Sequence, residues 1–310
     1  MKTVTLGTDL VAPNVVLGLM RIAGKTDDEV RELVRTAREA GIDFVDTADV
    51  YGGELHGSDR RFAQAMQLTS SERAALTIQT KCGIVPDGPY YDFSYKHIME
   101  SVEGSLAALQ TDYIDILLLH RPDALVEPEE VARAFDELET AGKVRMFGLS
   151  NHTPRQIDLL KKFVRQPIVA HQLQLSMTHA PIIAQGLASN MLGAEQSVTR
   201  DGGGILDYCR LHDITVQAWS PFQAGFFTGV FFDSPQYPEL NAAIDRLATE
   251  YAVPPMAIAT AWILRHPANM QVVLGTTTPQ RVADAAQGSD VTLTKAEWYE
   301  LFRAAGHIIP

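Results

Sequence analysis

The feature that most constrains this chain is a regular alternation of short apolar runs with amphipathic stretches. Continuous apolar runs are typical of parallel strands buried on both faces, and the stretches between them repeat apolar residues at helical spacing. The strands are expected at 9–20, 42–47, 76–81, 113–120, 144–150, 167–175, 214–220 and 271–276. About eight strand–helix units in this order predict a (β/α)8 TIM barrel.

The helices between these strands begin at recognisable signals. Thr26 and Glu29 have the spacing of a capping box, in which each side chain accepts from an open backbone N–H of the other residue. Ser58 and Asp59 are expected to cap the next helix. Pro128 suits the first position of a helix, because no intrahelical partner is lost there.

Residues 1–20 are expected to contain a small β-hairpin that caps the base of the barrel, followed by the first barrel strand. No polar linker or shift in composition divides the chain, so residues 1–310 are predicted to be one barrel domain. The first strand is not followed by a GxGxxG sequence, which argues against a dinucleotide-binding sheet of the Rossmann type.

Composition excludes several classes of function. A net charge of −12 argues against non-specific nucleic-acid binding, although a local basic pocket for a phosphate is compatible with it. Two distant cysteines without a Cys/His cluster predict neither a disulfide framework nor a metal site. No run approaches the ~20 apolar residues that cross a bilayer, and no signal peptide is evident. We expect a cytoplasmic protein without a membrane partner, and the oligomeric state is not indicated.

Chemically matched side chains occur where three consecutive strands end. Asp46 ends the second expected strand, Lys81 the third and His120 the fourth, and Tyr51 follows in the loop after the second. The carboxyl ends of barrel strands form the active site in this fold, and neighbouring strands lie ~5 Å apart. Lys81 is expected to lower the pKa of Tyr51 and so make it a proton donor near neutral pH. Asp46 would hold Lys81, and His120 would bind a substrate oxygen.

Each residue also has an alternative interpretation, and Tyr51 before two glycines could be a half-buried turn residue. Asp46 and Lys81 could form a structural ion pair, and His120 could be a loop histidine. Lys81 could form a Schiff base, as in barrel aldolases. The presence of all four groups at successive strand ends favours a shared catalytic site over these separate explanations.

With these residues in place, nearly the whole chain resembles the aldo-keto reductase superfamily, most closely its bacterial general reductase branch. The sequence DTADVYGG is similar to the family's catalytic Asp–Tyr segment, TIQTKCG to its lysine strand and DILLLHRPD to its histidine strand. The resemblance implies reduction of aldehydes or ketones to alcohols by a nicotinamide cofactor, with Tyr51 as general acid. The rival functions are a non-turnover nicotinamide-binding regulatory subunit and a Schiff-base aldolase.

The resemblance also implies a set of cofactor-binding residues. Those expected near the nicotinamide are Ser150, Asn151, Gln172, Trp219, Ser220, Pro221 and Phe222, with Trp219 in the stacking position. Those expected near the adenosine phosphates are Gly275, Thr276, Thr277, Thr278 and Arg281. Many members have Lys where this chain has Gly275, and Asn where it has Ala285. Arg281 favours NADPH, because a guanidinium can hold a phosphate by a forked contact; NADH is the alternative, and a surface role for Arg281 is the other explanation.

The substrate is expected to be a small carbonyl compound bound among aromatic side chains. Candidates follow the third strand, the sixth strand and the seventh strand: Tyr90, Tyr91, Phe93, Met177, His179, Phe222, Phe226, Phe227, Phe231 and Phe232. About half of these are expected to pack their loops against the barrel instead of lining the pocket. The identity of the substrate and the direction of the reaction are not indicated.

Overall fold

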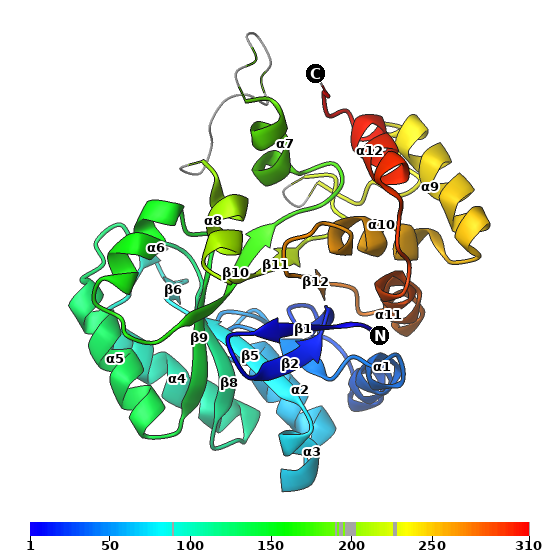
Figure 1. Cartoon of the computed structure of the whole chain (residues 1–310). Helices are drawn as coiled ribbons and strands as arrows, with labels where there is room; N and C mark the ends of the chain where they lie inside the picture. The colour runs from blue at the N-terminus through cyan, green and yellow to red at the C-terminus, as the bar shows by residue number, and fades with distance from the viewer. Residues whose placement is uncertain (89, 190, 192–194, 196–202, 226–227, 310) are drawn as a thin grey trace.

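Eight parallel strands close into a barrel in the order in which they occur along the chain, which confirms the predicted fold (Figure 1). The computed structural model describes residues 1–88, 90–189, 191, 195, 203–225 and 228–309. The barrel strands are β3 (Val15–Gly18), β4 (Phe44–Asp46), β5 (Thr77–Cys82), β8 (Ile114–Leu119), β9 (Val144–Ser150), β10 (Ile168–Gln174), β11 (Thr215–Trp219) and β12 (Met270–Leu274).

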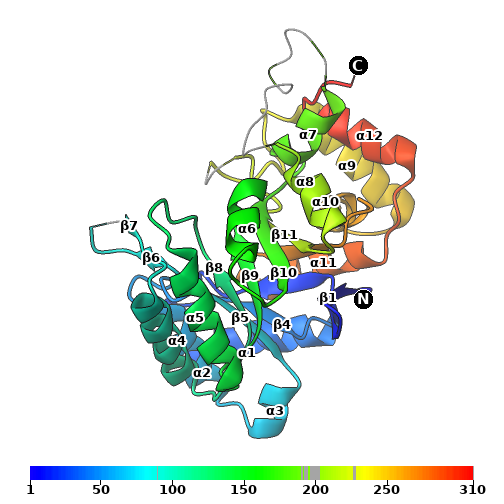
Figure 2. The ribbon, with the colours of Figure 1, turned by 60° about the vertical axis from the view of Figure 1, so that its left-hand side comes forward.

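Helices surround the barrel and cover the outer faces of its strands (Figures 1 and 2). They are α1 (Asp27–Glu39), α2 (Gly57–Met66), α3 (Ser70–Ala74), α4 (Tyr95–Leu109), α5 (Pro128–Thr140), α6 (Pro154–Lys161), α7 (Pro181–Leu187), α8 (Ile205–Leu211), α9 (Pro238–Tyr251), α10 (Pro255–Leu264), α11 (Pro279–Ala286) and α12 (Lys295–Ala304), with a 3-10 turn, η2 (Gln287–Ser289). Between these helices and the strands lies the main apolar core.

Most helix starts agree with the sequence. The Thr26–Glu29 capping box is present, and Pro128 occupies the first turn of α5. Helix α2 is present as predicted, but its expected capping residues are wrong: the helix begins at Gly57, one residue before Ser58, and His56 precedes it without a side-chain capping bond. The Asp59 carboxylate instead accepts a hydrogen bond from the Thr47 hydroxyl.

The predicted hairpin at the barrel base is confirmed. It consists of β1 (Thr3–Leu6) and β2 (Leu10–Pro13), paired antiparallel. Leu6 and Ala12 pack with Phe44, Ile116 and other inward-facing residues of the barrel. The hairpin therefore closes the end of the barrel opposite the candidate site.

Four short elements were not predicted from the sequence: the helices α3 and α7, and the strands β6 (Ile84–Val85) and β7 (Tyr90–Tyr91), which pair with each other. Their sequences are too short for periodicity to identify them. Helix α10 is buried on nearly all sides, which accounts for its lack of a polar face. No helix in the described ranges combines the length and apolar character that crossing a membrane requires.

Candidate active site

The acidic and basic groups predicted at the strand ends form one buried cluster. The Lys81 Nζ donates to Asp46 Oδ2 at 2.7 Å and to the Thr47 carbonyl at 2.8 Å. Lys81 is fully buried and Asp46 is 3% exposed. Adjacent parallel strands β4 and β5 carry these two residues, so the barrel itself sets their separation. A buried pair with these extra partners keeps both side chains in a single arrangement.

A tight turn brings Tyr51 over this pair. The Tyr51 N–H donates to the Ala48 carbonyl, and the Tyr51 carbonyl accepts from Ser58 N–H at 2.9 Å. Gly52 has φ +103°, and a Cβ there would lie 2.5 Å from the Ser58 nitrogen, so this position requires glycine. The Tyr51 ring then meets the His120 ring edge-on, with centroids 5.6 Å apart, and Lys81 Nζ lies 5.0 Å from the Tyr51 centroid.

Burial and neighbouring charges together set the pKa values in this cluster. Burial raises the pKa of Tyr51 above its usual 10.0, and the nearby Lys81 charge offsets only part of the increase. The expected lowering of the Tyr51 pKa is therefore wrong. Burial opposes the charged form of Lys81, but Asp46 and Tyr51 outweigh it and the pKa of Lys81 is raised. Burial, with the Lys81 and Arg121 charges, holds the pKa of His120 well below 6.5.

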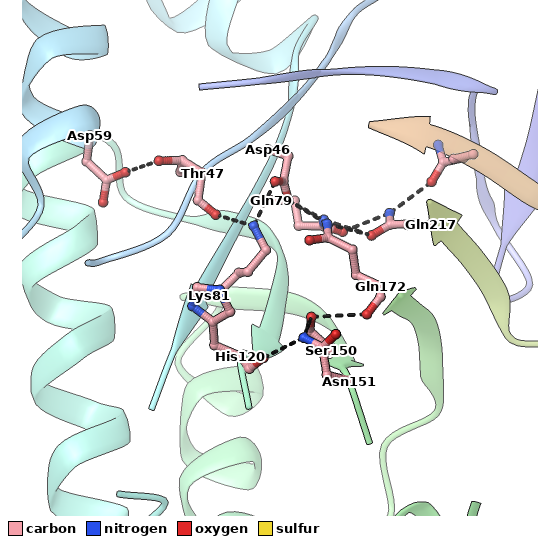
Figure 3. Close-up of polar contacts among 11 residues, drawn as sticks. Asp46, Thr47, Asp59, Gln79, Lys81, His120, Ser150, Asn151, Gln172 and Gln217 are labelled. Carbon is pink, nitrogen blue, oxygen red and sulfur yellow. Dashed lines mark hydrogen bonds and ion pairs between the residues drawn. The ribbon is translucent and has the colours of Figure 1, made fainter. Parts of the chain in front are cut away.

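Two further carboxylates lie behind the Tyr51 loop. Asp59, once expected to cap α2, is fully buried and accepts from the Thr47 hydroxyl at 2.7 Å. The backbone carbonyl of the same Thr47 accepts from Lys81 Nζ. The Asp59 carboxylate therefore supports the position of Lys81 indirectly, through Thr47 (Figure 3). Asp49 is buried, and this burial raises its pKa to about 7. Its Oδ1 has no hydrogen-bond partner in the described part of the chain.

A chain of glutamine amides crosses the inside of the barrel to Asp46. Gln79 and Gln172 each donate to Asp46 Oδ1, at 2.6 and 3.0 Å, and each also donates to Gln217 Oε1. Gln217 donates to Gln271 at 2.9 Å, and Gln271 donates to the Pro13 carbonyl at 2.7 Å. Both N–H groups of Gln172 are therefore engaged, which leaves its carbonyl oxygen as the available acceptor.

One cavity joins this cluster to the loops after β9 to β12. Its volume is about 430 Å3, and Asp46, Tyr51 and His120 line it. All twelve residues predicted to bind a cofactor also line it: Ser150, Asn151, Gln172, Trp219, Ser220, Pro221, Phe222, Gly275, Thr276, Thr277, Thr278 and Arg281. Lys81 does not line the cavity itself and is connected to it by the ion pair with Asp46. The structure thus brings together the whole predicted set along one pocket.

Within the pocket, Ser150, Asn151 and Trp219 are linked. The Trp219 indole N–H donates to Asn151 Oδ1 at 3.1 Å, and Asn151 Nδ2 donates to Ser150 Oγ at 2.7 Å. Asn151 adopts φ +61° at the end of β9, and Ser220 adopts φ +53° after β11.

The aromatic lining is less extensive than predicted. Phe222 lines the cavity. The Phe232 ring packs against the Phe222 ring, with centroids 5.5 Å apart. Phe93, Met177 and Phe231 are wrong as pocket residues, because they are buried in the core. Tyr90 and Tyr91 are exposed on β7, and His179 is half-buried outside the cavity, so these three are also wrong. Phe226 and Phe227 lie outside the described residues.

Other residues of the cavity were not identified from the sequence. They are Gly18, Met20, Arg21, Val50, Ile84, Arg121, Gln223, Val230, Met256 and Val273. Most lie in loops whose path depends on tertiary packing, so no local pattern marks them. Strand parity could have identified Gln79 as inward-facing, since it shares parity with Lys81.

Comparisons with known proteins agree with this geometry. The sequence model of the Aldo/keto reductase family matches residues 14–304. The 6-dehydroglucose reductase of Agrobacterium fabrum is 32% identical, over 98% of each chain. The uncharacterized oxidoreductase YcsN of Bacillus subtilis is 32% identical over the full length of both.

The structural comparison supports the barrel fold. The structure of an aldo-keto reductase from Klebsiella pneumoniae in complex with NADPH superposes with a TM-score of 0.76 at 22% identity, covering 100% of this chain and 96% of that one. Together, the match across residues 14–304, the full-length relatives and the shared barrel show that the chain is an oxidoreductase of the aldo/keto reductase family.

Proposed function

We propose that the protein reduces aldehydes or ketones to alcohols with a nicotinamide cofactor, NADPH being favoured over NADH. The observation that carries the proposal is the convergence of Tyr51, His120 and the Asp46–Lys81 pair at one pocket with all twelve expected cofactor residues. When bound, the nicotinamide supplies a hydride from its C4 to the carbonyl carbon. The side chains of this protein supply the proton, orient the carbonyl and hold the cofactor.

Tyr51 is the proton donor in this proposal. Its raised pKa keeps the phenol protonated at neutral pH, so it can donate to the carbonyl oxygen as negative charge develops there. The Lys81 ammonium stabilises the phenolate that remains after transfer. Asp46 and the Thr47 carbonyl hold that ammonium in place, at 2.7 and 2.8 Å.

His120 orients the carbonyl. Its pKa lies well below 6.5, so the imidazole is neutral and offers one N–H donor. The Nδ1 is buried without a hydrogen-bond partner in the described residues. Edge-on contact with Tyr51 places both rings at the same end of the pocket. Two preplaced donors can then bind one substrate oxygen.

The pocket suits the nicotinamide end of the cofactor. Gln172 presents a carbonyl oxygen to the cavity because both its N–H groups are engaged. That oxygen can accept from the carboxamide NH2. The side-chain oxygens of Ser150 and Asn151 can accept from the same amide, because their own donors bond within the protein. Trp219, the last residue of β11, lines the cavity and provides the stacking surface.

The opposite end of the pocket suits a phosphate. Thr278 precedes α11 without forming a side-chain capping bond, so the first N–H groups of this helix remain available to an anion. Arg281 is exposed on the first turn of α11, and the described residues include no carboxylate paired with it. These features favour the 2′-phosphate of NADPH.

The lysine chemistry argues against an aldolase. A Schiff-base lysine needs a neutral amine, whereas Lys81 has a raised pKa and is fully buried between Asp46 and Thr47. A non-turnover regulatory subunit would not need a protonated tyrosine beside a buried lysine. The reductase therefore accounts for more of the observed groups.

Kinetics of NADPH oxidation test the proposal. Suitable carbonyl compounds are 4-nitrobenzaldehyde, which fits the apolar side chains of the cavity, and 6-dehydroglucose, after which the Agrobacterium relative is named. We expect Tyr51→Phe to lose activity by about 10²–10⁴-fold while NADPH affinity, measured by fluorescence titration, is retained. A wild-type rate no higher than that of Tyr51→Phe would refute the reductase, and tighter binding of NADH than NADPH would refute the role of Arg281.

A further inference from the structure

Arg121 is a cation beside the catalytic residues whose charge the proposed reaction does not use. It directly follows His120 in the loop after β8, and it lines the same cavity as His120 and Tyr51. Two other guanidinium groups line the cavity on the cofactor side. Arg21 contacts the backbone just after β12, and Arg281 lies on α11. Arg121 is therefore the guanidinium at the end of the pocket where the carbonyl is expected to bind.

The charge of Arg121 has no ion-pair partner in the described ranges. The nearest carboxylate along the chain, Asp123, accepts from two backbone N–H groups, at 3.0 and 2.8 Å. Among the described lining residues of the cavity, the one carboxylate is Asp46, whose charge Lys81 balances at 2.7 Å. Because Arg121 is half-buried, water and salt would screen an anion bound there less than one at an exposed site.

The contact with Trp219 leaves the Arg121 guanidinium able to bind a further group. The Arg121 Cζ lies 5.8 Å from the centre of the Trp219 ring, near the ~6 Å limit of a cation–π contact. Such a contact engages the face of the guanidinium, and the five N–H donors at its edge are not used by it. After burial and the Lys81 charge, Arg121 is a further cause of the lowered pKa of His120, so its charge acts on the catalytic end of the pocket.

The side chains that line the cavity beside the catalytic residues are otherwise apolar. Val50 immediately precedes Tyr51, and Ile84 lies in β6, directly after the strand that carries the catalytic lysine. Phe222 lines the cavity from the loop after β11. This combination of apolar surface with one guanidinium suits a compound that has an apolar body and an anionic group. A carboxylate fits best, because its two oxygens match the forked donors of an arginine.

We propose that Arg121 binds a carboxylate of the substrate, and that the protein favours aldehydes or ketones carrying this group over uncharged compounds of the same shape. The carbonyl oxygen then lies against Tyr51 and His120, and the apolar body contacts Val50 and Ile84. The carboxylate accepts two N–H groups of Arg121 at a distance from the reacting carbon. This inference rests on the proposed reduction of carbonyl compounds in this pocket.

Steady-state kinetics with matched aldehydes test the role of Arg121. The substrates are 3- and 4-carboxybenzaldehyde, each paired with its methyl ester, at saturating NADPH, and the measured quantity is the acid-to-ester ratio of kcat/KM. We expect Arg121→Met, which keeps the apolar stem, to lower this ratio by about ten- to hundredfold for at least one isomer, as for one hydrogen bond between charged groups. The intrinsic reactivity of each aldehyde cancels, because every variant is measured with the same pair.

Two further readouts distinguish binding of the carboxylate from a general structural effect. The loss should appear in KM for the acid while kcat is retained, because the carboxylate is remote from the reacting carbon and its binding is equal in the ground and transition states. Raising the salt concentration should reduce the difference between the wild type and Arg121→Met. Arg121→Lys keeps the charge without the fork, so its ratio should lie between those of the other two proteins.

Arg21→Met is the matched control. It removes the same charge from the same cavity, but on the cofactor side. We expect its acid-to-ester ratio to equal that of the wild type, whatever its absolute rates. If Arg21→Met lowered the ratio as much as Arg121→Met, the effect would be one of overall pocket charge and the proposal would be wrong.

The possible results separate this inference from the proposed reductase activity. An unchanged ratio in Arg121→Met for both isomers would overturn the role of Arg121 while leaving the reductase in place. Weaker NADPH binding by Arg121→Met in fluorescence titration, with the ratio unchanged, would place Arg121 at the coenzyme and also overturn it. Failure of the wild type to reduce any of the four aldehydes, or the aldehydes named above, would instead refute the reductase.

Discussion

Replacing Lys81 by methionine tests how the buried charge at the barrel mouth is held. Methionine keeps most of the apolar stem, so loss of the ammonium dominates over cavity formation. Removing one partner of a buried ion pair costs about 3–5 kcal/mol. Asp46 retains hydrogen bonds from Gln79 and Gln172, at 2.6 and 3.0 Å, which partly compensate its charge. We therefore expect the lower end of that range, about 3 kcal/mol.

A double-mutant cycle measured by urea unfolding isolates the interaction. Asp46→Asn leaves a buried ammonium and should cost a similar amount, whereas Asp46→Asn with Lys81→Met removes both charges. We expect the double variant to be more stable than either single variant. Neutral pH is suitable, because the raised folded pKa of Lys81 makes its contribution fully present below 10.5 and lost as pH rises through the folded value. Additive losses would refute the coupling.

Three other predictions follow from the structure. The rate of carbonyl reduction should stay level from pH 6.5 to about 9 in a pH–rate profile, since the pKa of His120 lies below that window and the pKa of Tyr51 lies above 10.0; a step that persists in Asp49→Asn, which removes the carboxyl with a pKa of about 7, would contradict these roles. Trp262→Phe should lower the free energy of unfolding by about 1–3 kcal/mol in urea, because the ring stack is kept while the Trp298 carbonyl loses its 3.2 Å donor; an unchanged midpoint would count against it. Asp49→Asn should stabilise the protein more above pH 7 than at pH 3.8, because the raised folded pKa makes wild-type stability fall between these values; equal gains in thermal unfolding at both pH values would refute this.

The strand ends could be predicted accurately from the sequence, whereas the paths of the loops could not. Asp46, Lys81 and His120 could be placed because long apolar runs fix where strands end, and parallel strands bring their ends together. Tyr51 followed from its distance to that end and from the glycine turn. The pKa of Tyr51 could not be obtained in this way, since it depends on how deeply the loop is buried.

The errors have a common physical cause. Asp59 has the residue type and the position expected of a helix cap. Its carboxylate nevertheless accepts from the Thr47 hydroxyl instead of from the backbone N–H groups at the start of α2. Phe222 and Phe231 lie in one aromatic loop, but the first lines the cavity and the second is buried beneath it. Composition shows that such a loop contacts something apolar; the fold decides which side chains remain open to a ligand.

The glutamine chain inside the barrel has a consequence for how the protein can diverge. Each amide of Gln79, Gln217 and Gln271 both gives and receives a hydrogen bond, so replacing one leaves a neighbour unsatisfied at a cost of about 1–3 kcal/mol. A single substitution at one of these glutamines therefore produces a less stable protein, whereas coordinated substitutions at two of them avoid that loss of stability. We expect these positions to be inherited as a block, with pairwise replacements more frequent among relatives than isolated ones.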